Sequence, residues 1–119
     1  MEGKQLYPFR AHCSQLQSCC HKTVNRIIDL IENYPESSKF LAKYAKESLV
    51  MERLCDYLCH ACCNSDKVSN HALKEYHQKC KELSKLCSQL EKKISKEDYK
   101  NIRCKEIIKL CTNKHSKKG

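Results

Sequence analysis

Residues 55–63 read Cys55-Asp56-Tyr57-Leu58-Cys59-His60-Ala61-Cys62-Cys63, so four of nine residues are thiols, and the stretch contains neither Gly nor Pro. At 3.6 residues per turn, Cys55, Cys59 and Cys63 follow one another at steps of four, and Cys62 lies one heptad after Cys55. The sulfurs therefore form a strip along one side of a helix. Such a strip is typical of a ligand surface or of a set of disulfides.

The heptad step between two cysteines recurs in three other segments of the chain. The further pairs are Cys13 and Cys20, Cys80 and Cys87, and Cys104 and Cys111. Residues seven apart lie two turns apart on one face of a helix. Four segments therefore each present two thiols on one face, which indicates that the four faces meet in a common core.

The composition predicts an all-α protein. The 119 residues suit a single domain, and they include only two Gly and two Pro and no Trp. Lys, Glu, Leu, Ser and Ile, which fill the spaces between cysteines, are common in helices. Apolar residues at steps of three and four predict helices over about 6–34, 38–63, 67–94 and 96–112.

Turn signals separate these four predicted helices. Pro35 ends the first, a turn at 64–66 ends the second, and Ser95 begins a capping box for the fourth. Short turns predict an antiparallel, up-down-up-down four-helix bundle over residues 1–112, with a disordered basic tail at 113–119. In a regular bundle, one level of the core holds Cys13, Cys62, Cys80 and Cys111, and the next holds Cys20, Cys55, Cys87 and Cys104.

Charge and cysteine content bear on partners and compartment. The formal charge is +9, but the four Arg are scattered, which argues against nucleic-acid recognition. No segment has the apolar length of a membrane span. Eleven cysteines, an odd number, and an N-terminus without a signal-like apolar run indicate a reducing, cytoplasmic location. A secreted location with disulfides is the alternative for a processed chain, and the sequence gives no indication of oligomeric state.

Thiols in this number predict a soft-metal site. Thiolates select Cu(I), Zn and iron–sulfur clusters, and a continuous lining of sulfur suits several Cu(I) ions in linear or trigonal coordination. Two layers of four cysteines could instead hold two structural Zn ions. The predicted core ligands are Cys13, Cys20, Cys55, Cys59, Cys62, Cys80, Cys87, Cys104 and Cys111, with Cys19 and Cys63 at the edge. Candidate ligands at the mouth of the site are Met51, His60, His71 and His77.

Two local motifs resemble those of the bacterial copper storage proteins, a four-helix-bundle copper-binding family. They are Cys55-x3-Cys59-x3-Cys63 on one helix and His77-x2-Cys80 on another, and paired thiols on all four helices add to the likeness. The resemblance implies cysteines lining the inside of an antiparallel bundle, many bound Cu(I) ions, and His or Met near the open end. It therefore implies metal storage or detoxification. This chain differs in its heptad spacing, its sulfur-free half and its Lys-rich surface.

Two other interpretations remain open. The inward cysteines could form disulfides that staple a helical bundle acting through protein–protein contacts, or they could pack as small apolar residues in an interaction module. Enzymatic activity is not expected. Cys59 and Cys62 have the Cys-x2-Cys spacing of redox enzymes, but no βαβ pattern accompanies them, and no paired carboxylates occur.

Overall fold

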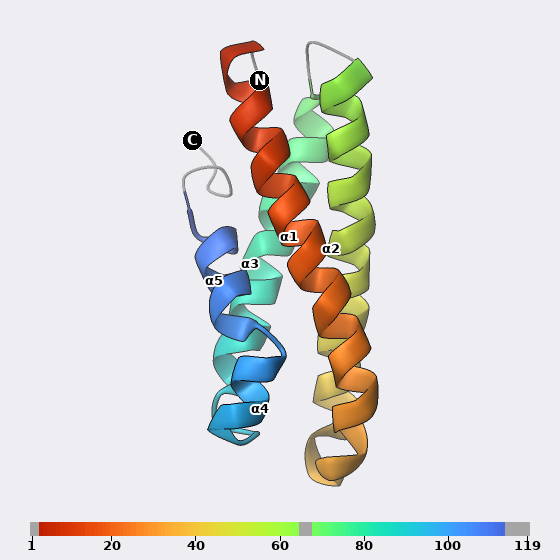
Figure 1. The fold of residues 1–119 in the computed structure, drawn as a ribbon, viewed down its shortest axis with the longest axis vertical. Helices are drawn as coiled ribbons and strands as arrows, with labels where there is room; N and C mark the ends of the chain where they lie inside the picture. The colour runs from red at the N-terminus through yellow and green to blue at the C-terminus, as the bar shows by residue number, and fades with distance from the viewer. Residues whose placement is uncertain (1–2, 65–67, 114–119) are drawn as a thin grey trace.

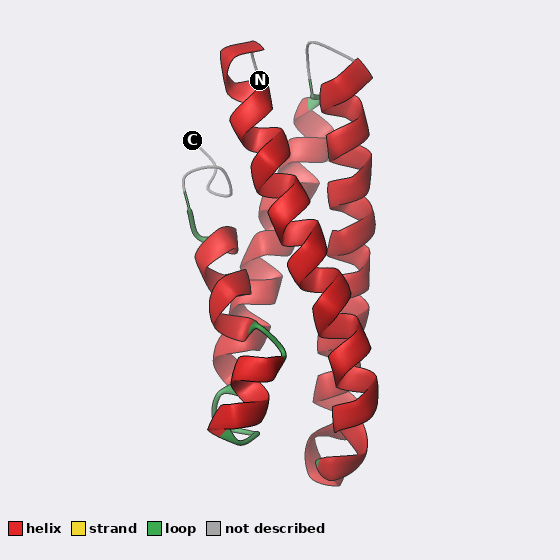
Figure 2. Ribbon diagram, in the orientation of Figure 1, coloured by secondary structure: helices red, strands yellow, loops and turns green. Residues whose placement is uncertain are grey.

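The computed structural model describes residues 3–64 and 68–113, and no β-strand occurs in these two ranges (Figure 2). The predicted all-α class is therefore confirmed. The five α-helices and two 3-10 turns are, in chain order, α1 (Gly3–Leu30), η1 (Ile31–Asn33), η2 (Pro35–Ser37), α2 (Ser38–Asn64), α3 (Asn70–Leu90), α4 (Lys96–Asn101) and α5 (Cys104–Cys111). Apart from Asn113, the predicted tail lies outside the described residues.

The helices lie roughly side by side along an elongated molecule measuring 46 × 22 × 21 Å. In Figure 1, α1 runs downward from the N-terminus, α2 returns upward, α3 runs downward, and α4 and α5 return along the remaining side. The most extensive contact is between α1 and α2, and α5 packs against both α3 and α1. Three long helices and two short ones thus enclose one core.

Local hydrogen bonds explain two of the helix starts. The Ser69 hydroxyl accepts from the Ala72 amide (3.1 Å) at the start of α3, and the Ser95 hydroxyl accepts from the Asp98 amide (3.2 Å) at the start of α4. These are N-caps, which satisfy amides that have no partner within the helix. The Ser95 cap was predicted from the sequence. The third helix is shorter than predicted, since it begins at Asn70 and ends at Leu90.

The fourth helical segment is divided, whereas the sequence predicted one helix over about 96–112. Arg103 has φ 60° and ψ 28°, a left-handed conformation that interrupts the helix between α4 and α5. The freed carbonyl of Ile102 accepts hydrogen bonds from the Thr23 hydroxyl of α1 (2.8 Å) and the Tyr44 hydroxyl of α2 (3.3 Å). These two buried donors satisfy the carbonyl and link the break to both neighbouring helices.

The core has two chemically different regions. We call the seven buried cysteines the thiol core: Cys13, Cys20, Cys55, Cys80, Cys87, Cys104 and Cys111. We call the buried aliphatic side chains beyond it the aliphatic end: Ile27, Leu30, Leu41, Leu90 and Ile94. Tyr44 lies between the two regions along α2 and is fully buried. The molecule is therefore sulfur-rich in one part of a continuous core and hydrocarbon-rich in the other.

Candidate functional site

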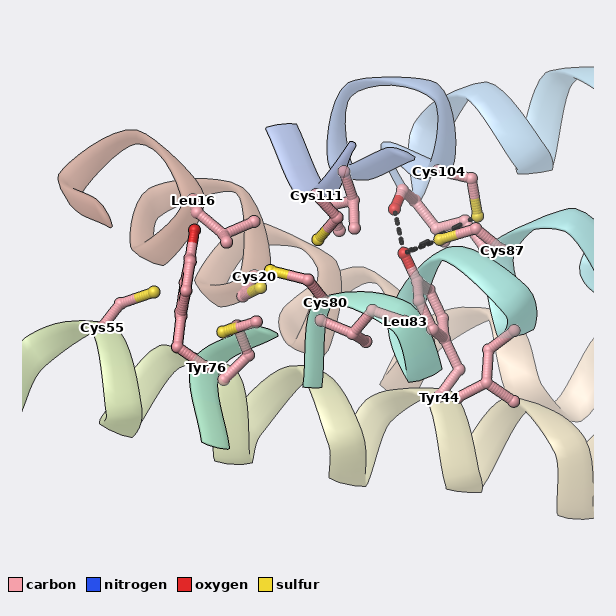
Figure 3. Packing of buried hydrophobic residues seen from close by; sticks show 14 of the residues in the cluster. Leu16, Cys20, Tyr44, Cys55, Tyr76, Cys80, Leu83, Cys87, Cys104 and Cys111 are labelled. Atoms are coloured by element: carbon pink, nitrogen blue, oxygen red, sulfur yellow. Dashed lines mark hydrogen bonds between the residues drawn. The ribbon is translucent and has the colours of Figure 1, made fainter. Parts of the chain in front are cut away.

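The structure distributes the eleven cysteines over three environments. The seven of the thiol core are buried, Cys19, Cys59 and Cys62 are half-buried, and Cys63 is exposed. Figure 3 shows Cys55 at one side of the labelled row, Cys20, Cys80 and Cys111 in the middle, and Cys87 with Cys104 at the other side. Thiols from α1, α2, α3 and α5 thus meet inside the molecule, although they lie far apart in the sequence.

Six of the seven buried thiols fall into three pairs, each drawn from two helices, in which one thiol shifts the pKa of the other. We call these the three thiol pairs: Cys13 with Cys55, Cys80 with Cys111, and Cys87 with Cys104. The first pair joins α1 to α2, and the other two join α3 to α5. The seventh thiol, Cys20, interacts electrostatically with members of all three pairs. The thiol core is therefore a set of buried thiols close enough to shift one another's pKa.

Two of these pairs belong to single levels expected from a regular bundle, and the third joins two levels. Cys80 and Cys111 share a predicted level, as do Cys87 and Cys104. Cys13 was expected at the level of Cys62, and it shifts the pKa both of Cys62 and of Cys55, one heptad earlier on α2. Cys62 itself is half-buried.

A tyrosine closes the thiol core on the side of the aliphatic end. The Tyr44 hydroxyl receives hydrogen bonds from the Cys87 thiol (3.3 Å) and the Cys104 thiol (3.6 Å), and it donates to the Ile102 carbonyl. Figure 3 shows these three contacts converging on one oxygen atom. Because each buried polar atom of this group has a partner, the group fixes the position of the Cys87–Cys104 pair.

Aromatic residues cover the opposite side of the thiol core. Phe9 and Tyr76 are fully buried and meet edge to face, with ring centroids 5.5 Å apart. The Tyr76 hydroxyl and His12 Nε2 are 2.6 Å apart, and Asn113 Nδ2 lies 3.1 Å from His12 Nδ1. The thiol core therefore lies between these aromatic residues and the aliphatic end.

Burial and thiol–thiol contact control ionisation in the core. A hydrogen bond to the partner cysteine, followed by burial, raises the pKa of Cys55, Cys87 and Cys111 well above that of a free thiol. Burial raises the pKa of Cys20. The exception is Cys104, whose pKa is lowered by its hydrogen bond to Cys87 and, in addition, by those to Tyr44 and Tyr99. Cys104 is therefore the buried thiol best placed to ionise.

The remaining cysteines lie at the surface of the thiol core. Cys59 donates to the Arg10 carbonyl (3.7 Å), and burial, Cys13 and Cys62 raise its pKa to about 11. Burial and Cys13 also raise the pKa of Cys62. On another face, the Cys19 thiol donates to Glu106 (3.5 Å), and burial and this carboxylate raise its pKa. The half-buried thiols of Cys59 and Cys62 thus lie near the buried thiol of Cys13.

The structure places the four predicted mouth ligands in different environments. Met51 is fully buried in the core. His60 and His71 are exposed and lie beside Asp56 and Glu75, respectively, on their own helices. His77 is half-buried, and its ring stacks edge to face on Tyr76. Within residues 3–64 and 68–113, no group of three or more His, Cys, Asp or Glu side chains is arranged to hold a metal ion. The thiol core therefore offers pairs of sulfurs in place of a preformed four-ligand centre.

Sequence reasoning missed the polar residues that hold the thiols in place. Tyr44 and Tyr76 occupy core positions of the predicted helices, but their pattern does not reveal that their hydroxyls bond to Cys87 and His12. Thr23 lies beside the predicted apolar face of the first helix, and its buried hydroxyl donates to the Ile102 carbonyl, 79 residues away in the sequence. A Thr or Tyr at a buried helix position is the only signal that the sequence carries for such a contact.

Comparison with known proteins does not assign the chain to a family: no family model, no curated protein and no solved structure matches it. No helix in the part of the chain that the structure describes is long and apolar enough to cross a membrane.

Proposed function

We propose that the chain is an up-down-up-down four-helix bundle, with its fourth helix divided at Arg103, that binds and sequesters Cu(I) through its buried thiols. The observation that carries this proposal is the presence of seven buried cysteines from α1, α2, α3 and α5 in one core. Thiolates are soft ligands that favour Cu(I) over hard cations such as Mg²⁺ or Ca²⁺. The proposed role is storage or detoxification of the metal, without turnover.

Pairs of thiols favour Cu(I) over Zn. A structural Zn site needs four ligands at the corners of a tetrahedron. Cu(I) accepts two or three sulfurs, and a sulfur can bridge neighbouring ions, so a series of thiol pairs such as Cys80–Cys111 and Cys87–Cys104 suits it better. Cys20, which interacts with all three pairs, is positioned to act as a bridging ligand.

Charge balance in the core limits how the metal binds. Two buried thiolates around one Cu(I) would leave a net negative charge in an apolar interior, which is strongly unfavourable. One Cu(I) for each thiolate leaves the core neutral, so each ion is expected to replace one thiol proton. Because the pKa values of Cys20 and Cys55 are raised, metal binding has to displace these protons, and affinity is expected to fall in acid. A reducing compartment would keep the thiols available.

The test is an anaerobic titration of the fully reduced protein with Cu(I) against a competing chromophoric chelator. We expect uptake of several equivalents, with about one proton released for each ion. Replacing both members of one buried pair, as in C80S/C111S, should lower the capacity, whereas the control C63S changes an exposed thiol and should leave it nearly unchanged. No uptake, or a capacity lost only when His60 and His71 are replaced, would contradict the proposal.

A further inference from the structure

A long groove runs along the surface between α2 and α3. It consists of three hollows with volumes of about 540, 440 and 570 Å³. The first and second hollows share Glu82, and the second and third share Phe40 and Gln89, so the three are parts of one groove. We call it the α2–α3 groove. From His71 to Gln89 on α3 it extends over about 27 Å, at 1.5 Å per helical residue.

The floor of the α2–α3 groove is apolar at two places. Val50 and Leu54 lie in the first hollow, and Phe40 and Leu86 lie in the second. Val50 is 40% exposed, and Phe40 and Leu54 are half-buried against the core, so this apolar surface is in part open to water. Phe40 and Val50 are ten positions apart on α2, which separates the two apolar places by about 15 Å, or about three turns.

An ion-pair cluster lies between the two apolar places. Lys79 Nζ of α3 is 2.6 Å from Glu47 Oε2 of α2 and 3.0 Å from Glu82 Oε2 of its own helix. Only 19% of the Lys79 side chain and 15% of the Glu47 side chain are exposed. The cluster thus joins the two helices, and it engages both carboxylates of this part of the groove with a lysine of the groove itself.

The rim of the α2–α3 groove is positively charged. Four exposed lysines line it and form no ion pair with any residue that the structure describes: Lys43, Lys74, Lys85 and Lys92. Lys93 lies over the Phe40 ring, 5.0 Å from its centroid. The one further acid of the lining, Glu75, lies 3.2 Å from His71 Nε2. The groove therefore combines apolar floor with positive charge that the described chain does not compensate.

We propose that the α2–α3 groove binds an acidic amphipathic helix of another protein. The partner helix places apolar side chains on one face, three turns apart, against the two apolar places of the floor. Its aspartates or glutamates flank that face and meet the four lysines of the rim. This binding function is separate from the proposed Cu(I) site, because its contacts come from lysines and carbon side chains.

The charge and shape of the groove favour this occupant over two others. A second copy of the chain, related by a two-fold axis, would place the same lysines against one another. An anionic membrane would attract the lysines, but a flat surface does not reach Leu86, which lies between the helices and is 5% exposed. A helix fits the length of the groove and reaches both apolar places at once.

The experiment measures the binding of labelled synthetic peptides to the reduced, metal-free full chain by fluorescence anisotropy. Each peptide has about 20 residues, which as a helix spans about 30 Å. The acidic peptide carries two Leu pairs three turns apart on one face, with Glu beside that face. One control peptide has Lys in place of every Glu, and another has its two Leu pairs on opposite faces. We expect the acidic peptide to bind about tenfold more tightly than either control, and less tightly at high salt.

Variants of the protein place the binding in the groove. Val50→Asp and Lys85→Glu should each weaken binding of the acidic peptide about tenfold. The matched controls lie on α1: Ile28→Asp, at a side chain that is 66% exposed, and Lys22→Glu, at an exposed lysine, should leave the affinity unchanged. Far-ultraviolet circular dichroism checks that all four variants fold. No saturable binding of the acidic peptide, equal binding of the Lys peptide, or an equal loss in the α1 variants would overturn the proposal.

Two further measurements test the other occupants. Sedimentation velocity would show a dimer that Val50→Asp dissociates if a second copy fills the groove. Flotation with phosphatidylglycerol vesicles would show binding that Lys85→Glu removes if a membrane covers it. Either result, without binding of the acidic peptide, would overturn the proposal. Cu(I) uptake does not enter these measurements, so the failure of one proposal is distinguishable from the failure of the other.

Discussion

The thiol core and the aliphatic end are built on the same helices and the same helical period, but they perform different tasks. At the aliphatic end, side chains such as Leu41 and Leu90 are fully buried and have no reactive atom. In the thiol core, each position holds a small buried side chain that carries a reactive sulfur atom. The comparison indicates that stability and chemistry are separated along the long axis of the molecule.

The largest expected effect tests this separation directly. Leu41→Ala removes a fully buried side chain from the aliphatic end, and it should lower the free energy of unfolding by roughly 2–5 kcal/mol. Cys20→Ala removes a single sulfur atom and should cost only about 1 kcal/mol. Urea unfolding of the reduced proteins measures both. Folded Leu41→Ala should retain its Cu(I) capacity, and Cys20→Ala should have a reduced capacity. The opposite result would contradict the separation of stability and chemistry between the two regions.

Tyr44 lies at the border of the two regions, and removing its hydroxyl should affect both. Tyr44→Phe leaves the buried Ile102 carbonyl with one donor fewer and the Cys87 and Cys104 thiols without their oxygen partner. We expect a loss of about 1–3 kcal/mol in the free energy of unfolding and a rise in the pKa of Cys104. Urea unfolding and pH-dependent alkylation measure the two effects. Tyr57→Phe is the matched control, because Tyr57 is 58% exposed; an equal loss there would show that Tyr44 has no special role.

Much of this architecture could be predicted from the sequence, because helical period and heptad spacing depend on residue type alone. The helix class, the helical segments and the inward position of the seven buried cysteines follow from the spacing of apolar residues and cysteines. The break at Ile102 and Arg103 does not, since neither residue is Gly or Pro and the carbonyl is satisfied by Thr23 and Tyr44 from distant helices. The influence of Cys13 on Cys55 was also not predictable, because it depends on how two long helices lie side by side.

Alkaline pH should destabilise the reduced thiol core. Burial raises the pKa of Cys20, so the folded protein keeps this proton while the unfolded chain loses it near pH 8.5. The stabilising contribution is complete below that pH and is lost as pH rises toward the folded-state pKa. The loss is about 1.4 kcal/mol per pH unit for each such thiol. Urea unfolding between pH 7.5 and 9.5 should show a shallower pH dependence for Cys20→Ala than for wild type.

Leu41→Ala is the control for this pH series, because it removes no titrating group. Its stability should be lower at every pH, with the wild-type dependence on pH preserved. If Cys20→Ala and wild type show the same dependence, Cys20 titrates alike in the folded and unfolded states, and the dry environment inferred for the thiol core is wrong.

The smallest expected effect concerns the residue that separates α4 from α5. Arg103 has a left-handed conformation that glycine adopts without steric cost, while glycine gains more freedom in the unfolded chain. Arg103→Gly should therefore raise the free energy of unfolding by only about 0.5 kcal/mol. Arg53→Gly, at an exposed position inside α2, should lower it by about 1 kcal/mol. Equal losses in the two variants would mean that residues 101–104 form a continuous helix in solution.

The most direct test of the central proposal is X-ray absorption spectroscopy of the reduced protein loaded with Cu(I). The account predicts copper in the monovalent state, surrounded by two or three sulfur ligands, with copper neighbours where Cys20 and the pairs share bridging thiolates. The same spectrum should be obtained from a variant in which His60 and His71 are replaced. Coordination dominated by nitrogen or oxygen, or a spectrum that changes when those histidines are removed, would contradict a thiol-core site.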